Sequence, residues 1–162
     1  MLEYALFENP IAYVAEAQTI TLFIGGDDIG DAALAVAEGA PIHIIESAIQ
    51  SYATHTTRML KSISRVSKAH VIVCTQYNPF PNTPAASTSI DALNMVTTRI
   101  ATATGASVAP VHAWFAGNQA ALIAGYRTGR IQDALRGVLP IHPNNEGHSV
   151  IANGLLPLFR RG

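Results

Sequence analysis

The sequence predicts an α/β protein in which a parallel sheet lies between two layers of helices. Three short apolar runs rich in β-branched residues, at 19–24, 71–75 and 107–111, are typical of strands that are buried on both faces. Segments with helical periodicity separate these runs, and another helical segment follows the last run. This alternation of strands and helices is typical of a three-layer α/β/α architecture.

The first half of the chain alternates clearly between the two kinds of element. Strand 19–24 leads into the glycine-rich stretch 25–39, which predicts a tight turn and a short helix. A long helix is predicted from Glu46 to about Lys68, because apolar residues recur at helical spacing opposite a charged face. Those apolar residues are Ile49, Tyr52, Met59, Ile63 and Val66. The second strand, at 71–75, follows directly.

The second half repeats the pattern with shorter elements. Residues 89–104 predict a helix, and strand 107–111 contains Pro110, which has no N–H to donate to a neighbouring strand. We therefore expect this strand at an edge of the sheet. Residues 117–137 predict one or two short helices, and a final helix begins at about Asn145 after an asparagine cap.

Composition excludes several classes of protein. The 162 residues are 49% hydrophobic and 13% charged, which is typical of a globular chain, and we expect one domain over residues 1–162. The net charge of -1 lacks the basic excess of a nucleic-acid-binding protein, so we expect no nucleic-acid partner. The apolar runs are too short to cross a bilayer and no signal peptide is visible, so we expect a soluble protein whose compartment stays open. The single cysteine, Cys74, lies in an apolar run and is expected to be an inert core residue rather than a nucleophile.

His142 is a candidate catalytic residue. It stands before Pro143 in "LPIHPNNEGHSVIANGLL", at the entry to the last helix. In open α/β sheets, ligands bind beyond the carboxyl ends of the strands, where loops 25–31, 76–88 and 112–120 are expected to converge with this histidine. A titratable ring held at a rigid corner there suits proton transfer, although a purely structural histidine is the alternative.

Four stretches together resemble a known family. They are "ITLFIGGDDIG" (20–30), "VIVCTQYNPFP" (71–81), "SVAPVHAWFAGN" (107–118) and "IHPNNEGHSVIA" (141–152). In this order they are similar to the blocks of the SGNH, or GDSL-type, hydrolases, a family of esterases and lipases. The resemblance implies a flavodoxin-like sheet, a small ester substrate, and no cofactor or metal.

The resemblance also implies residue roles. In that family a serine attacks the ester carbonyl, a histidine takes its proton, and an aspartate three residues earlier orients the ring. By position, His142 would be the general base, Asp27 stands where the family has an oxyanion-binding asparagine, and Leu139 stands where it has the aspartate. The first loop would be supported by Gly25, Gly26 and Asp28, and Asp28 would be buried and hold the loop by hydrogen bonds.

Departures from the family pattern limit the expected activity. No Gly-Asp-Ser block precedes strand 19–24, so the family's first β-α-β unit and its nucleophile are missing from this sequence. An oxyanion donor is typically worth about 2.7 to 4 kcal/mol of barrier, and loss of a triad carboxylate costs roughly 10⁴ in rate. The chain alone is therefore expected to hydrolyse esters poorly or not at all.

Two functions remain open at this point, together with a weaker third. The chain is either part of an ester hydrolase whose nucleophile segment lies elsewhere, or a non-catalytic binding module on the same scaffold. The third is a cation site formed by Asp27, Asp28 and His142. Other residues have structural alternatives: Asp27 can be a turn former, His148 can pack or cap within the last helix, and Trp114 and Phe115 can be core instead of pocket.

The missing unit has a structural consequence. In the family its first strand lies beside the strand that matches 19–24, so that strand would be left with an unpaired edge. We expect the edge to be covered by self-association into a homo-oligomer, by residues 2–17 of the chain, or by a strand of a partner.

Overall fold

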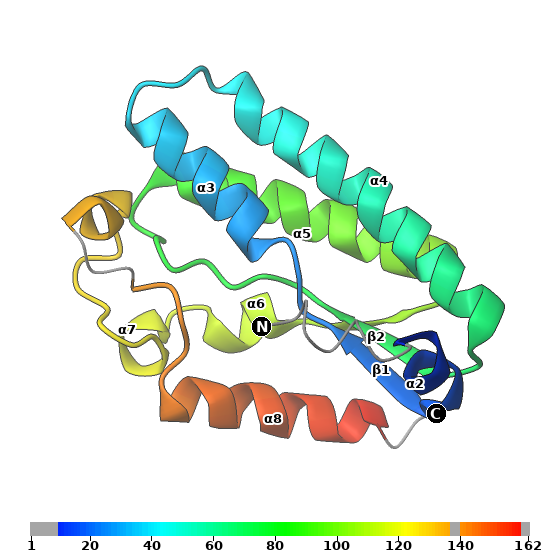
Figure 1. The fold of residues 1–162 in the computed structure, drawn as a ribbon. Helices are drawn as coiled ribbons and strands as arrows, with labels where there is room; N and C mark the ends of the chain where they lie inside the picture. The colour runs from blue at the N-terminus through cyan, green and yellow to red at the C-terminus, as the bar shows by residue number, and fades with distance from the viewer. Residues whose placement is uncertain (1–9, 137–139, 160–162) are drawn as a thin grey trace.

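A parallel sheet forms the centre of the protein. The structure, a computed structural model, describes residues 10–136 and 140–159. The three strands lie in the order β1 (Thr19–Leu22), β2 (His70–Cys74) and β3 (Ser107–Ala109), and both pairings are parallel. In this register Thr19 pairs with His70, and Ile72 pairs with Ser107. The predicted α/β class with a parallel sheet is confirmed (Figure 1).

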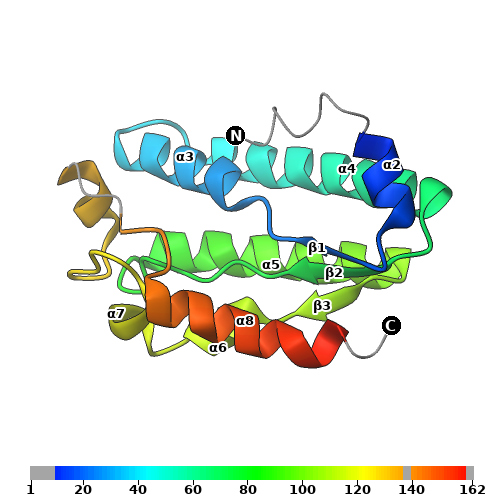
Figure 2. The ribbon, with the colours of Figure 1, turned by 60° about the horizontal axis from the view of Figure 1, so that its bottom comes forward.

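Helices cover both faces of this sheet. Figure 2 shows α3 and α4 on one side of the strands and α6 and α8 on the other, which is the predicted three-layer arrangement. The helices are α2 (Pro10–Glu16), α3 (Gly26–Ala37), α4 (His43–Val66), α5 (Pro84–Thr104), α6 (Val111–Phe115), α7 (Gln119–Leu122), the 3-10 helix η1 (Ile131–Arg136) and α8 (Asn145–Phe159).

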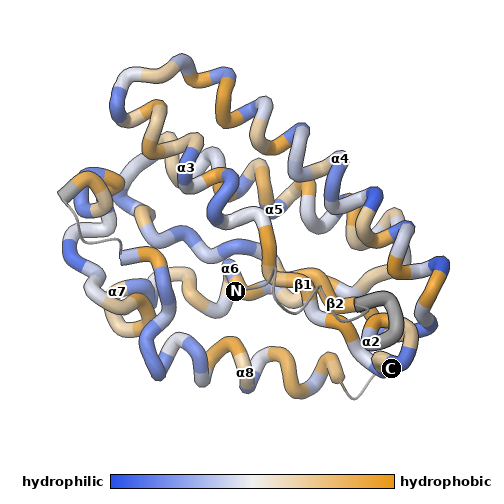
Figure 3. The backbone as a smooth tube through the Cα atoms, viewed as in Figure 1, coloured by the Kyte–Doolittle hydropathy of each residue, from blue (hydrophilic) through white to orange (hydrophobic). Residues whose placement is uncertain are grey.

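The central strand shows why its sequence is continuously apolar. Val73 packs in a cluster with Leu60 of α4 and Ile100 of α5. Ile72 and Cys74 point to the other face, where α6, α7 and α8 supply the partners. Because successive side chains of a strand point to opposite faces, a strand covered on both sides needs apolar residues at every position. Figure 3 shows these hydrophobic strands at the centre and a mixed pattern along α4.

The third strand is shorter than predicted, because it ends just before Pro110. It ends at Ala109, and Val111 already belongs to α6, so Pro110 lies between the two elements. The N–H of Thr75 donates to the Ala109 carbonyl at 3.0 Å, and the N–H of His112 donates to the Thr75 hydroxyl oxygen at 3.1 Å. The strand does lie at an edge of the sheet, as predicted from the proline.

The opposite edge of the sheet belongs to β1. Within residues 10–136 and 140–159, β2 is the only strand that pairs with it. Helix α2 precedes β1 and lies against α4, so this part of the N-terminal segment extends over the helical layer. The other residues predicted to cover the edge, 2–9, are outside the described residues. No helix in the described part of the chain combines the length and apolarity needed to span a membrane.

Candidate active site

The candidate site lies where the sheet ends. Strand β1 runs into the Gly25–Gly26 turn and α3, β2 runs into residues 75–83, and His142 lies on the segment that leads into α8. These segments enclose a cavity of about 130 Å³. Its walls are Gly26, Asp27, Ile29, Ala33, Gln76, Tyr77, Asn78, Pro79, Phe80, Ala86, Ser89, Ile90, Ile141 and His142. The structure thus brings His142 together with Asp27, although they are more than a hundred residues apart in the sequence.

A wider groove of about 530 Å³ shares part of this wall and extends toward α8. His142 and Asp27 line it as well, together with Asp28 and His148. Among the residues described, no three histidine, cysteine, aspartate or glutamate side chains converge closely enough to hold a metal ion. A cation site made of Asp27, Asp28 and His142 therefore has no support in the geometry.

The Gly25–Gly26 turn brings the chain from β1 into α3. Gly25 has a φ of 95°, in the left-handed region that favours glycine, and a Cβ there would lie 2.5 Å from the Tyr52 ring. Asp27 and Asp28 follow in the first turn of α3, where the helix dipole favours negative charge. Both are exposed, so the expectation that Asp28 is buried and holds the loop by hydrogen bonds is wrong.

Gln76 supports the turn instead. Its Nε2 donates to the Ile24 carbonyl at 2.8 Å, next to the two glycines. Asn94 of α5 fixes the Gln76 backbone, because its Oδ1 accepts from the Gln76 N–H at 2.7 Å and its Nδ2 donates to the Gln76 carbonyl at 2.8 Å. Gln76 was not predicted from the sequence. The signal available was a polar residue directly after a buried strand, at the end where parallel sheets bind ligands.

Hydrogen bonds hold the backbone around His142 on both sides. The His142 carbonyl accepts from the Ala124 N–H at 2.9 Å, and the Asn144 N–H donates to the Leu122 carbonyl at 2.9 Å. The Oδ1 of Asn144 accepts from the Gly147 N–H at 2.9 Å, which is the asparagine cap predicted for the last helix. The side chain of His142 itself is exposed at the mouth of the cavity.

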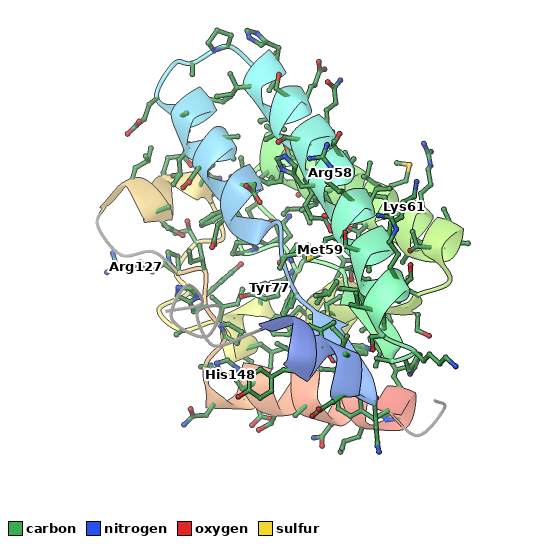
Figure 4. The ribbon with its side chains drawn as sticks, turned by 45° about the vertical axis from the view of Figure 1, so that its right-hand side comes forward. Arg58, Met59, Lys61, Tyr77, Arg127 and His148 are labelled. Carbon is green, nitrogen blue, oxygen red and sulfur yellow. The ribbon has the colours of Figure 1, made fainter. Side chains whose placement is uncertain are left out.

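Tyr77 forms a third attachment for this segment. Its hydroxyl donates to the carbonyl of Ile141 at 2.5 Å, one residue before His142, while its ring stacks on Phe115 with the centroids 4.4 Å apart. Burial raises the pKa of Tyr77 to about 12, and the charge of Asp27 adds to the shift, so the phenol stays protonated and donates. Figure 4 labels Tyr77, in the interior beyond the end of the sheet, and His148 on α8.

The remaining candidate residues fall into two groups. Leu139, at the triad-acid position, lies outside the described residues. Cys74 and Phe115 are fully buried in the core, Trp114 packs against that core, and burial raises the pKa of the Cys74 thiol to about 11, which disfavours the reactive thiolate. His148 is exposed on α8 and lines the groove, so the expected packing role does not describe its side chain.

A nucleophile is not evident among the described residues of the cavity wall. Ser89 is the serine that lines it, but this residue is buried in α5 and its hydroxyl donates to the Ala85 carbonyl at 2.8 Å. The site therefore combines an exposed imidazole, a carboxylate and an apolar interior. This arrangement can accept a proton from a nucleophile and hold an apolar group, but it supplies no activated hydroxyl of its own.

Comparisons with solved structures support the fold. The fold resembles that of the lipase Lip_vut3 from a goat rumen metagenome, with a TM-score of 0.75 and 20% identity over 93% of this chain and 69% of that one. A catalytic mutant of Axe2, an acetylxylan esterase from Geobacillus stearothermophilus, gives a TM-score of 0.66 and 17% identity over 98% of this chain and 65% of that one. The chain thus spans about two thirds of these structures.

The sequence comparisons decide the family. A search of curated proteins found no significant match. The GDSL-like lipase/acylhydrolase family matches residues 6–150, which is most of the chain. This protein therefore belongs to the GDSL-like lipase/acylhydrolase family.

Proposed function

We propose that this chain contributes the general base and the substrate cavity of a carboxylic ester hydrolase, an esterase or lipase. The observation that carries the proposal is the shared wall of the cavity, where His142 and the Gly26–Asp27 turn meet at the carboxyl ends of β1 and β2. His142 would accept the proton of an attacking serine and return it to the leaving alcohol. The serine would come from a Gly-Asp-Ser segment outside this sequence, upstream of it or on another chain.

Asp27 weakens the oxyanion site in this proposal. At the position of the family's asparagine, an ionised carboxylate has no N–H to donate to the negative oxygen of the tetrahedral intermediate. Its charge already opposes ionisation of the nearby Tyr77 phenol, and the same field would oppose a developing oxyanion. Together with Leu139 at the acid position, this supports weak hydrolysis by the chain alone.

The edge of β1 offers a place for the missing unit. An added parallel strand would pair with the side of β1 that no strand among the described residues covers, and it would end beside the groove that contains His142 and Asp27. We propose that this edge is covered by such a strand from outside the described residues, from a second copy of the chain or from a partner. Sedimentation of the purified chain tests whether a second copy covers the edge, because a monomer at all concentrations excludes self-association.

A second candidate function is a non-catalytic binding module. Two positions favour it, Asp27 in place of an oxyanion donor and Leu139 in place of the triad acid. Such a module would keep the cavity and its ligand but would need neither a nucleophile nor a proton acceptor at His142.

Ester hydrolysis and covalent labelling distinguish the two functions. The chain is incubated with p-nitrophenyl acetate or butyrate and with a serine-directed fluorophosphonate, beside the variants His142→Ala and His148→Ala. Both histidines line the groove, so His148→Ala is the matched control. Hydrolysis that falls with His142→Ala and persists with His148→Ala supports the hydrolase. Hydrolysis unchanged by His142→Ala contradicts the assigned base. Absence of both hydrolysis and labelling supports the binding module when a Gly-Asp-Ser segment is supplied with the chain, because the proposed serine lies outside this sequence.

A further inference from the structure

The interior of the cavity is far more apolar than its mouth. Asp27 and His142, the exposed residues of the wall, mark the mouth. The buried residues mark the interior, where Ile29 and Ile90 come from α3 and α5, Ala86 comes from the first turns of α5, and Phe80 comes from the loop after β2. A ligand that fills this space must therefore present a polar end to the mouth and an apolar end to the interior.

Three buried side chains of the wall are polar, Gln76, Asn78 and Ser89, and the last two are already paired. Asn78 donates through Nδ2 to the Ser87 hydroxyl oxygen at 2.9 Å and accepts through Oδ1 from the Phe80 N–H at 2.8 Å. The Ser89 hydroxyl donates to its own helix, at the Ala85 carbonyl. Because Asn78 and Ser89 have hydrogen-bond partners within the protein, the part of the cavity that they line favours a hydrocarbon chain.

Gln76 places an acceptor near the mouth. Its Nε2 donates to the Ile24 carbonyl, and its Oε1 faces Gly26. A Cβ added at Gly26 would lie 3.0 Å from this oxygen. No protein donor to this oxygen occurs among the described residues. A ligand group with an N–H or O–H beside its apolar chain could therefore bond to Oε1 as the chain enters.

The volume limits the length of the chain. A protein cavity of roughly 150 Å³ lined by aliphatic side chains holds a benzene-sized molecule, with six carbons. The present cavity measures about 130 Å³, which is close to that size. We propose that this cavity binds the short acyl group of the substrate, up to about six carbons, and that Ala86 sets its depth because a larger side chain there would fill it. The identity of the ligand as an acyl group rests on the proposed function.

Binding of amides tests this without any nucleophile. N-methylamides of acetic, butyric, hexanoic and octanoic acids carry the same acyl chains with an N–H, and their binding is followed by NMR titration of the methyl signals of Ile29 and Ile90, with Val108 as a remote reference. We expect the N-methylamide of butyric acid to shift the methyl signals of both isoleucines. It should bind roughly tenfold more tightly than the N-methylamide of octanoic acid, because a longer chain overfills the packed cavity. Equal affinity for the N-methylamide of octanoic acid, or no shift of these methyl groups with any amide, would overturn the proposal.

Two alanines of the same helix turn provide matched variants. Ala86 is buried in the cavity wall, whereas Ala85 is exposed and outside it. Ala86→Leu should weaken binding of the N-methylamide of butyric acid roughly tenfold, and Ala85→Leu should leave it unchanged. If Ala86→Leu fails to fold, the chain-length series on the unaltered protein still decides the proposal.

The outcome separates this inference from the proposed function. Amide binding would support the cavity assignment whether or not this chain hydrolyses esters, because the proposed nucleophile lies outside the sequence. Hydrolysis of p-nitrophenyl octanoate as fast as that of the butyrate would support the hydrolase and overturn the chain-length limit.

Discussion

Replacing Tyr77 by phenylalanine removes one hydrogen bond that ties the core to the segment before His142. The change removes the hydroxyl that donates to the Ile141 carbonyl and keeps the ring that stacks on Phe115. A typical hydrogen bond contributes about 0.5–1.5 kcal/mol, and the half-buried Ile141 can recruit water in its place, so we expect a loss of about 1 kcal/mol in the free energy of unfolding.

Thermal unfolding measures this loss. For a domain of this size, 1 kcal/mol corresponds to a decrease in Tm of about 2–4 °C. Tyr13→Phe is the control, since the Tyr13 side chain is 68% exposed on α2 and should leave Tm unchanged. The second readout is the imidazole NMR signal of His142, which should broaden or shift when the backbone beside it loses its anchor. An unchanged Tm together with an unchanged His142 signal would refute the reasoning.

The pH dependence of stability gives a further check on Tyr77. Its pKa is raised in the folded state from 10.0 to about 12, so the unfolded chain loses this proton first as the pH rises. The stabilisation is complete below pH 10 and is lost as the pH approaches 12, by about 2 kcal/mol once partial exposure is allowed for. Urea unfolding should therefore show a steeper fall in stability above pH 10 in the unaltered protein than in Tyr77→Phe.

Three other perturbations test separate parts of the site and its frame. Asp27→Asn restores an N–H donor and removes a charge, so in a preparation that hydrolyses p-nitrophenyl butyrate we expect kcat to rise roughly a hundredfold, and no change would contradict the oxyanion role. Gly147→Ala places a Cβ against the Leu122 carbonyl and should cost about 1–3 kcal/mol in urea unfolding, unless that contact relaxes freely. Burial raises the pKa of Asp133, but hydrogen bonds from the Thr128 N–H and hydroxyl and from the backbone of Arg130 and Gly129 together outweigh it and lower the pKa. This carboxylate therefore stabilises the fold above its ordinary pKa, and the effect is lost in acid. Thr128→Val should lose less stability between neutral and acid pH than the unaltered protein.

Periodicity and residue type predicted the layers of the fold correctly. The runs at 19–24, 71–75 and 107–111 are strands in the structure because uninterrupted β-branched apolar residues suit a strand covered on both faces. Their ends shifted by one or two residues. Pro110 accounts for the early end of the third strand, but β2 ends at Cys74, where the next residue, Thr75, bonds to the distant Ala109, and nothing local to either residue specifies that contact.

The candidate site was predictable only in part. The motif around His142 marked the histidine, and the Gly25–Gly26 turn was visible from its glycines and aspartates. Gln76 and Tyr77 were not recognised, because their importance comes from the Ile24 and Ile141 carbonyls that they reach across the fold. The expectation of a buried Asp28 failed for the same reason, since exposure in a first helical turn depends on what packs over it.

The sequence by itself determined the α/β class, the helix entry after His142 and the membership of a hydrolase family, because each depends on local pattern or on the identity of residues in order. The tertiary structure decided that His142 and Asp27 share a wall, that a small apolar cavity lies behind them, and that Gln76 and Tyr77 hold the two segments in place. Side chains far apart in the chain meet only when the core packs. Cavity size and hydrogen-bond partners are therefore properties of that packing, which local periodicity does not encode.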